Sequence, residues 1–217
     1  DKEIGTTKRG NGPAYRDKYA RTGVRVEKVP ELRPFLIDLY EEFHQRTIPS
    51  PVILCEGAQG FGLDIDWGDY PFVTSSHCTV GGAILNGIPA QAVRDVWGVL
   101  KIYETYVGKK KFEPNDPVFS AIREIGEEFG ATTGRPRQCN WLNWNLLEQA
   151  ARMNGITHLV INKMDVLRRV GVWKVLENGQ EINFLGEEAI KEFLIWKLGR
   201  LGIEAQNIHF SVDKDKI

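Results

Sequence analysis

The stretch Thr157-His158-Leu159-Val160-Ile161-Asn162-Lys163-Met164-Asp165 determines both the expected fold and the first functional hypothesis. Its apolar run predicts a buried strand, and the tetrad Asn162 to Asp165 follows where that strand ends. A carboxylate there can accept paired hydrogen bonds from the ring N–H and amino group of guanine, a donor pair that adenine lacks. The stretch therefore predicts a GTP site, although an isolated match of this kind is as often a simple strand-end turn.

Strands and helices alternate on both sides of this stretch. We expect helices at 14–22, 31–45, 116–129, 142–153 and 187–201, and strands at 51–56, 96–106 and 208–211. A hairpin is expected at 173–184, because Asn178-Gly179 favours a type I′ turn. The pattern predicts an α/β fold, with a mainly parallel central sheet flanked by helices and an additional antiparallel hairpin. Residues 1–217 are expected to form a single domain.

Composition limits the classes of partner. The 217 residues carry a formal net charge of −1, which gives no general attraction to nucleic acid or to an anionic membrane. The cysteines Cys55, Cys78 and Cys139 are odd in number and widely spaced, as in a reduced cytosolic protein. No run approaches the roughly 18 to 20 apolar residues that span a bilayer. The sequence predicts a soluble, cytoplasmic protein.

Two glycine-rich segments carry the residues expected to bind anions. In 130–137, GATTGRPR, small residues allow close backbone approach, and two arginines offer planar donors to carboxylate or phosphate. The opening loop 5–10, with Arg21 one helix later, is a second candidate. Each could instead be a solvated surface segment.

Other polar residues are more ambiguous. Gln59, exposed by the turn at 57–60, could read a base edge through its amide, or simply form the turn. The run Thr74-Ser75-Ser76 is equally compatible with phosphate ligands and with a turn. Asp64, Asp66 and Asp69 lack the pattern of a calcium loop, so we expect a solvated turn there and no metal site in the chain.

In this order, these motifs resemble the adenylosuccinate synthetase family, GTP-dependent ligases that join L-aspartate to IMP in purine (AMP) biosynthesis. The matching segments are GTTKRGNGPAYRDKYARTG, CEGAQG, LDIDWGDYPFVTSSHCTVGG, EFGATTGRPR, NKMDVL and IHFSVDKD. The resemblance covers most of the chain and implies that family's fold, which is related to the P-loop NTPases. The short connection from Arg25 to Gly57 is similar to the compact archaeal members.

The resemblance also implies roles for individual residues. Arg21 would reach the IMP phosphate in the partner subunit's site, which implies a homodimer. Mg²⁺ would accompany GTP, with ligands mainly outside this chain. The implied contacts are, for IMP, Thr7, Arg21, Gln59, Thr74, Val107 and Arg135; for aspartate, Thr132, Thr133, Arg135 and Arg137; and for GTP, Arg137, Lys163, Asp165 and Ser211.

In this family GTP phosphorylates the 6-oxygen of IMP, and the aspartate amine then displaces the phosphate. The catalytic Asp and His that the resemblance implies stand in G-D-E-G-K-G and N-A-G-H motifs, which do not occur here. The chain also opens without Met, so we expect an N-terminal catalytic segment upstream of it.

The chain departs from the family pattern in places, and two alternatives stay open. Asn143 stands where most members have Asp, and Lys8 replaces a usual glycine. The first alternative is a viral-type relative that joins aspartate to dGMP. The second is a non-catalytic protein that binds GTP or IMP.

Overall fold

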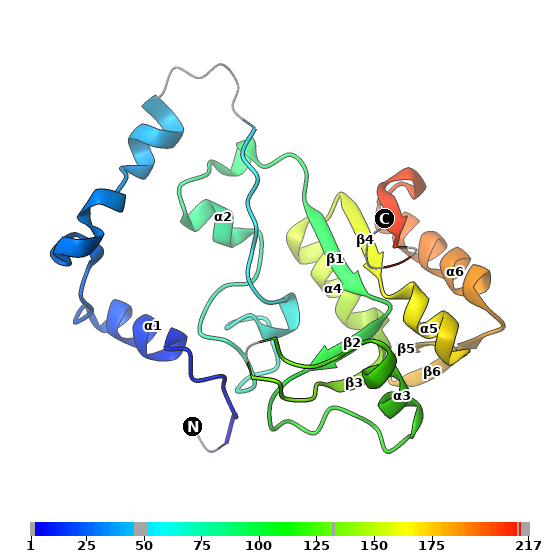
Figure 1. The fold of residues 1–217 in the computed structure, drawn as a ribbon. Coiled ribbons are helices and arrows are strands. Elements are labelled where there is room, and N and C mark those ends of the chain that lie inside the picture. Colours follow the sequence, from blue (N-terminus) through cyan, green and yellow to red (C-terminus); the bar gives the residue numbers. More distant parts are fainter. Residues whose placement is uncertain (1–2, 46–51, 132, 212, 214–217) are drawn as a thin grey trace. The chain divides into compact units, whose positions relative to one another are not determined.

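The chain divides into two compact units, each of which is described by itself. The structure is a computed structural model, and it describes residues 3–45, 52–131, 133–211 and 213. Residues 1–7 and 95–217 form one unit, which we call the sheet unit, and residues 8–94 form the other, which we call the loop unit (Figure 1). A single domain over residues 1–217 stays a prediction.

The sheet unit contains two sheets. The first is parallel, with strand order β1-β4-β7, and the second is mixed, with strand order β2-β3-β5-β6. In the second sheet β2 and β3 are antiparallel, β3 and β5 are parallel, and β5 and β6 form the antiparallel hairpin. The predicted α/β class is therefore confirmed. The strands are β1 (Trp97–Lys101), β2 (Tyr103–Tyr106), β3 (Gln138–Asn143), β4 (His158–Asn162), β5 (Trp173–Glu177), β6 (Gln180–Phe184) and β7 (Ile208–Phe210).

The helices of the sheet unit are α3 (Val118–Ile125), α4 (Trp144–Asn154), α5 (Met164–Val170), α6 (Glu187–Gly199) and the 3₁₀ turn η6 (Ala205–Asn207). Helix α4 packs against β3 and β5, α6 packs against β5 and β6, and α3 packs against β3 and α5. Their apolar faces enclose one core. Its largest fully buried side chains are Trp141, Tyr103, Phe119, Ile102, Ile122, Leu159, Ile161, Met164, Leu167, Ile190, Leu194 and Leu198.

Local sequence signals account for several of these boundaries. Asn143 caps α4 by accepting a hydrogen bond from the Leu146 N–H at 3.2 Å, and Gly155, with φ of 60°, ends the helix. The hairpin turns at Asn178 and Gly179, both with positive φ, as a type I′ turn requires. The predicted hairpin, the strand of the tetrad, the helix 187–201 and the strand 208–211 are confirmed.

Two predictions in the sheet unit need correction. The single strand expected at 96–106 is wrong, because the chain leaves one sheet at Ile102 and enters the other. The buried Ile102 donates its N–H to the Asn162 carbonyl at 2.9 Å, which fixes this crossing. The strand β3 was not predicted. The helix expected at 142–153 includes Leu142 and Asn143, which instead end β3.

The loop unit is built differently. Its only buried hydrophobic side chain, among the residues described, is that of Ile88. Short helices and turns follow one another without a described strand. They are α1 (Asn11–Ala20), η1 (Val26–Lys28), η2 (Pro30–Phe35), the π-helical η3 (Glu41–Gln45), η4 (Phe61–Leu63), α2 (Gly81–Leu85) and η5 (Ala90–Ala92).

The amphipathic helix expected at 31–45 is wrong. Pro34 lacks an N–H and disfavours the helical conformation of the residue before it, so only a 3₁₀ segment forms before Leu36. Phe35 is 78% exposed rather than packed on a core. The strand expected at 51–56 is also wrong over residues 52–56, which have no strand partner among the described residues. Residue 51 lies outside the described part.

Candidate functional site

The tetrad lies at the carboxyl edge of the parallel sheet. Strands β1, β4 and β7 all end at this edge, with Lys101 opposite Asn162 in register. The Ser211 N–H donates to the Ile161 carbonyl at 2.9 Å, which places the residue after β7 beside the end of β4. Polar residues that follow parallel strands thus gather at one edge, the usual place for ligands in α/β proteins.

Within this edge the tetrad residues have different surroundings. Lys163 takes a left-handed conformation with φ of 68°, and its Nζ donates to the Gly126 carbonyl at 2.9 Å. Asp165 stands in the first turn of α5, half-buried, and its carboxylate accepts no hydrogen bond from the residues the structure describes. The buried Ser211 hydroxyl donates to the Asp213 carbonyl at 2.6 Å. The Asp165 carboxylate is thus available to a ligand.

Residues 128–137, here named the arginine loop, form a small hairpin. The Arg137 N–H donates to the Glu128 carbonyl at 2.9 Å, and the Gly130 N–H donates to the Arg135 carbonyl at 2.8 Å. Gly134, with φ of 62°, makes the reversal that a glycine tolerates best. Thr133 is exposed near the tip, and Thr132 lies outside the described residues.

Arg135 has two guanidinium nitrogens without a partner. Its Nη1 donates to the Gly5 carbonyl at 3.0 Å, while Nε and Nη2 are buried and bond to nothing among the described residues. Arg168 uses the same two nitrogens to hold Glu187, at 2.7 and 2.8 Å. Arg135 therefore offers an unused fork that matches a carboxylate or a phosphate.

The opening segment joins the two other segments of the sheet unit that carry predicted IMP residues. Besides the bond from Arg135 to Gly5, the Lys109 N–H donates to the Ile4 carbonyl at 3.3 Å. The opening segment, which carries Thr7, thus contacts both the arginine loop and the segment that follows β2. That last segment carries the half-buried Val107.

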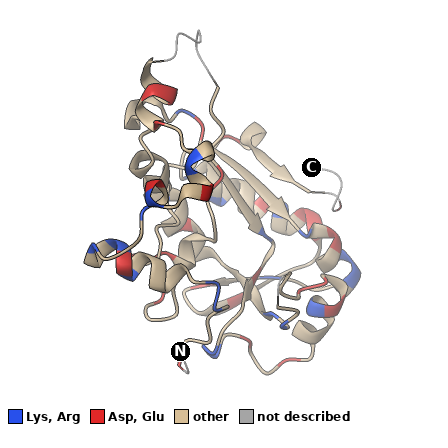
Figure 2. Cartoon of the chain, turned by 60° about the vertical axis from the view of Figure 1, so that its left-hand side comes forward, with Lys and Arg blue, Asp and Glu red and all other residues tan. Residues whose placement is uncertain are grey.

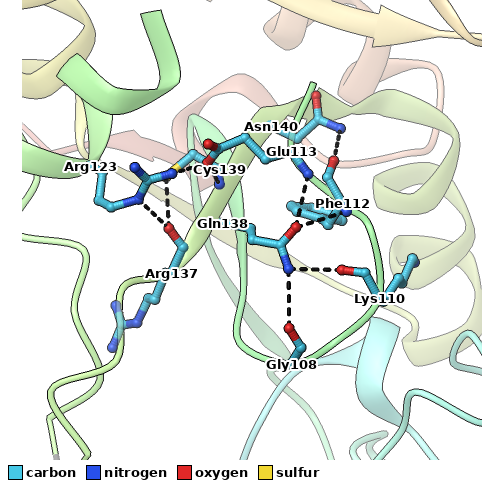
Figure 3. A network of polar contacts seen from close by, with 9 residues as sticks. All are labelled: Gly108, Lys110, Phe112, Glu113, Arg123, Arg137, Gln138, Cys139 and Asn140. Carbon is cyan, nitrogen blue, oxygen red and sulfur yellow. Dashed lines mark hydrogen bonds and ion pairs between the residues drawn. The ribbon is translucent and has the colours of Figure 1, made fainter. Parts of the chain in front are cut away.

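A polar network holds the second arm of the arginine loop (Figure 3). The Arg123 Nε donates to the Arg137 carbonyl at 2.6 Å, and its Nη2 pairs with Glu113. Glu113 also accepts from the Cys139 N–H at 2.7 Å, and Gln138 binds the backbone of residues 108–113 from both ends of its amide. The Arg137 backbone is thereby fixed, while its side chain points away from this network.

The other predicted site residues belong to the loop unit. Arg21 follows α1 and Gln59 lies in its turn; both are exposed, with φ of 62° and 61°. The exposure of Gln59 agrees with the prediction. Thr74 is half-buried, and its N–H donates to the Leu63 carbonyl at 2.8 Å.

The sequence predicts a solvated turn at Asp64, Asp66 and Asp69 in the loop unit. This prediction is wrong for Asp64, which is fully buried. Burial raises the pKa of Asp64, but hydrogen bonds from the Cys78, Asp66 and Trp67 N–H groups outweigh this effect and keep the pKa below its usual value. Oxygen and nitrogen atoms of Asp64, Asp66 and His77 lie within 4.8 Å of one another. The Asp64 carboxylate already accepts three hydrogen bonds, and His77 offers a nitrogen where Mg²⁺ prefers oxygen ligands.

Charge and hydropathy add little to the location of the site. Figure 2 shows acidic and basic residues interspersed along the chain, with no stretch of a single sign that dominates. In the part of the chain that the structure describes, no helix has the length and apolar character to cross a membrane.

The fold and this site define an α/β protein in which a carboxylate at a strand end and an arginine hairpin are held in one unit. Residues 26–183 match the family model for adenylosuccinate synthetase. The chain therefore belongs to the adenylosuccinate synthetase family.

Individual relatives agree with this assignment. The chain is 34% identical to adenylosuccinate synthetase of Lodderomyces elongisporus, over 87% of this chain and 56% of that protein. The solved structure of fully ligated adenylosuccinate synthetase from Plasmodium falciparum matches with a TM-score of 0.73 and 27% identity, over 96% of this chain and 68% of that one. Succinoaminodeoxyadenylate synthetase of cyanophage S-2L, bound to dGMP and dATP, shares the fold, with a TM-score of 0.58 and 23% identity over 77% of this chain and 55% of that one. The chain spans about half the length of the curated relatives it matches.

Proposed function

We propose that this chain is part of a GTP-dependent ligase that joins L-aspartate to IMP, giving adenylosuccinate, GDP and phosphate. The observation that carries the proposal is the buried, unpartnered fork of Arg135. A buried cation without a counter-charge is costly, so this geometry is explained best by an anionic ligand. Aspartate brings two carboxylates and IMP a phosphate, and both anions suit the fork.

GTP is proposed as the energy donor because of Asp165. Among the residues that the structure describes, none donates a hydrogen bond to its carboxylate, which lies at the edge of the parallel sheet. Guanine offers the two adjacent N–H donors that a carboxylate can accept together. Lys163 and Ser211, at the same edge, would contact the guanine, and Arg137 would contact both the GTP phosphates and aspartate.

The proposed chemistry has two balanced steps. N1 of IMP loses its proton to a base expected outside this chain, the γ-phosphoryl group of GTP moves to the 6-oxygen of IMP, and GDP leaves. The aspartate amine then attacks carbon 6, the C–O bond breaks, phosphate leaves and the amine loses a proton. In such transfers the protein contributes mainly positioning and neutralisation of charge. This chain would supply Thr7, Gln59, Thr74, Val107 and Arg135 for IMP, and Thr132, Thr133, Arg135 and Arg137 for aspartate.

Some properties of the enzyme are proposed from family resemblance alone. Mg²⁺ is expected with GTP, and its ligands are expected mainly outside these residues. The catalytic Asp and His are also expected outside the chain. A cytoplasmic location stays a prediction from the widely spaced cysteines.

The test is an assay of the purified full-length protein, of which this chain is part, with GTP, L-aspartate and IMP, and with dGMP as the alternative acceptor. Arg135→Ala should lower kcat/KM by about 2 to 4 kcal/mol of transition-state stabilisation, as expected for loss of a charged hydrogen-bonding group. Arg152→Ala is the matched control, because among the described residues Arg152 pairs only with Glu148, on the surface of α4. Full activity of Arg135→Ala would remove the arginine loop from the site, and turnover of dGMP alone would establish the viral-type alternative.

A homodimer is proposed as the working form, with Arg21 serving the partner's site. What supports it is the loop unit, where Phe35 is 78% exposed, Ile37 65% and Tyr40 63%. Clusters of exposed apolar side chains often mark protein–protein contacts. Arg21 itself is exposed at the end of α1, where it could reach another chain.

Mixing two inactive variants tests this arrangement. If Arg21 acts across the interface, Arg21→Leu and Arg135→Ala damage the same site of a mixed dimer, so the other site of each mixed dimer is intact. Random pairing should then restore up to about one quarter of wild-type activity. No recovery, in a mixture shown by light scattering to contain dimers that exchange subunits, would place Arg21 in its own subunit's site.

A further inference from the structure

Glu128 is a fully buried carboxylate at the base of the arginine loop, with 1% of its surface exposed. One carboxylate oxygen accepts from Lys101 Nζ at 2.7 Å and from Arg137 Nη1 at 2.6 Å. The other accepts from the Tyr103 hydroxyl at 2.7 Å. Burial raises the pKa of Glu128, but these three hydrogen bonds outweigh it and keep the pKa below its usual value. Glu128 is therefore ionised and fully paired at neutral pH.

The pair of Glu128 with Arg137 joins the two arms of the hairpin. The backbone of the same two residues is bonded at 2.9 Å, and an isolated bridge joins Phe129 and Pro136 one step further along the loop. A side-chain bond parallel to the backbone bonds sets the direction of the Arg137 guanidinium. It leaves the other nitrogens of Arg137 to face a ligand.

The same segment is tied to the edge that carries the tetrad. Lys101 ends β1, beside the end of β4, and binds Glu128, while Lys163 binds the Gly126 carbonyl. Two lysines at the ends of neighbouring strands thus bind residues 126 and 128. The arginine loop and the proposed guanine site share this support.

We propose that Glu128 is a positioning residue, which aims Arg137 at the aspartate substrate without touching that substrate itself. This inference rests on the proposed function. A buried ion pair adds little stability compared with apolar residues of similar size, so stability alone does not explain the cluster. One carboxylate shared by two cations also leaves a surplus positive charge, which favours an arriving anion. Because a misplacement of about 1 Å can cost about 100-fold in rate, the aim of Arg137 matters.

The experiment compares Glu128→Gln with Lys101→Met in the purified protein. Lys101→Met breaks one ion pair of the cluster and keeps the pair of Glu128 with Arg137, whereas Glu128→Gln breaks both pairs and so releases Arg137. We expect Glu128→Gln to raise the KM for L-aspartate about ten-fold or more, while the preference for GTP over ITP changes less than about two-fold. Lys101→Met should leave the KM for aspartate within about three-fold of wild type. If Glu128 had a structural role alone, both variants would lower the free energy of unfolding. Neither variant would then raise the KM for aspartate selectively.

Hydrogen exchange gives a readout that does not depend on turnover. The amides of residues 128–137 should exchange about ten-fold faster in Glu128→Gln than in wild type, and Lys101→Met should change them less. If Glu128→Gln does not fold, Glu128→Asp decides, because the shorter side chain keeps the charge but reaches Arg137 less well. An unchanged aspartate KM in a folded and active variant overturns this inference and leaves the proposed function intact. A full-length wild-type protein without ligase activity overturns both.

Discussion

The sheet unit and the loop unit bury their apolar side chains to very different extents. In the sheet unit Ile161 and Leu194 are completely enclosed. In the loop unit Phe35 is 78% exposed and Val52 99% exposed. Both units contain apolar residues, but only the strands and helices of the sheet unit form two layers that can cover them. The sheet unit thus carries its own core, whereas Phe35 and Val52 of the loop unit stay exposed.

The same difference separates the candidate site residues. Asp165 and Ser211 follow strands whose pairing fixes them, and Arg135 is bonded to Gly5. Arg21 and Gln59 stand on turns of left-handed conformation, with exposed side chains. In the sheet unit, we expect substitutions in the core to change the free energy of unfolding and substitutions at the site to change the choice of ligand. Substitutions in the loop unit should act mainly through contacts with other molecules.

The largest expected effect tests this contrast in burial directly. Leu194→Ala should lower the free energy of unfolding by about 2 to 5 kcal/mol, because it removes enclosed methyl groups and leaves a cavity. Phe35→Ala should change it by about 0.5 kcal/mol or less, as expected for an exposed position. Urea unfolding of each variant at low protein concentration gives the comparison.

Leu185→Ala supplies the matched control, since Leu185 lies in the sheet unit but is fully exposed. It should change the free energy of unfolding as little as Phe35→Ala does. If Phe35→Ala were as costly as Leu194→Ala at a concentration where the protein is monomeric, the loop unit would have a core of its own and the contrast would fail.

The contrast also explains how far the sequence predicts the fold. The strand of the tetrad, the hairpin at Asn178-Gly179 and the helix α6 follow from local patterns, and packing in the sheet unit reinforces those patterns. Residues 31–45 show helical spacing, but Pro34 interrupts them and no described core covers them. Where burial does not support a local preference, the preference alone is too weak to decide the structure.

The site was predictable to a similar, partial degree. Asp165 and Arg135 stand in motifs that are contiguous in sequence, so residue type and order are enough to suggest them. The roles assigned to them stay predictions. The cluster of Lys101, Tyr103 and Glu128 was missed, because residues 25 or more positions apart meet only through the crossing from β1 to β2. In the sequence, Glu128 beside Glu127 has the pattern of an ordinary solvated pair.

A smaller effect is expected from Asp165→Asn, which tests whether the sheet unit separates ligand choice from stability. The amide loses the paired acceptor for guanine but can donate to the carbonyl of xanthine. We expect kcat/KM with GTP to fall about 100-fold, or roughly 3 kcal/mol, with a gain for XTP. The free energy of unfolding should be almost unchanged, because Asp165 has no partner among the described residues.

Gln59→Ala in the loop unit is the companion variant for Asp165→Asn. It should raise the KM for IMP and leave the ratio of GTP to XTP use as in wild type. Unchanged nucleotide preference in Asp165→Asn would mean that this carboxylate does not read the base. A shifted preference in Gln59→Ala would show that the two units share the reading of guanine.

The smallest expected effect concerns Glu104, a half-buried carboxyl group on β2. Burial raises the pKa of Glu104 to about 7, from a usual value of 4.5. The folded protein therefore binds the Glu104 proton more tightly than the unfolded chain does, and stability falls as pH rises from 4.5 to 7. Glu104→Gln should have little effect at pH 4.5 and should raise the free energy of unfolding by about 1 to 3 kcal/mol at pH 8.

Glu187→Gln should show the opposite dependence on pH. Hydrogen bonds from Arg168 lower the pKa of Glu187 to about 2, so its contribution is present above pH 4.5 and is lost as pH falls toward 2. Glu187→Gln should therefore destabilise the protein at pH 8, where Glu104→Gln stabilises it. Urea unfolding of both variants at pH 4.5 and pH 8 checks the two signs together. If Glu104→Gln gave the same stability change at both pH values, the Glu104 carboxyl would be solvated. Burial on β2 would then not raise its pKa.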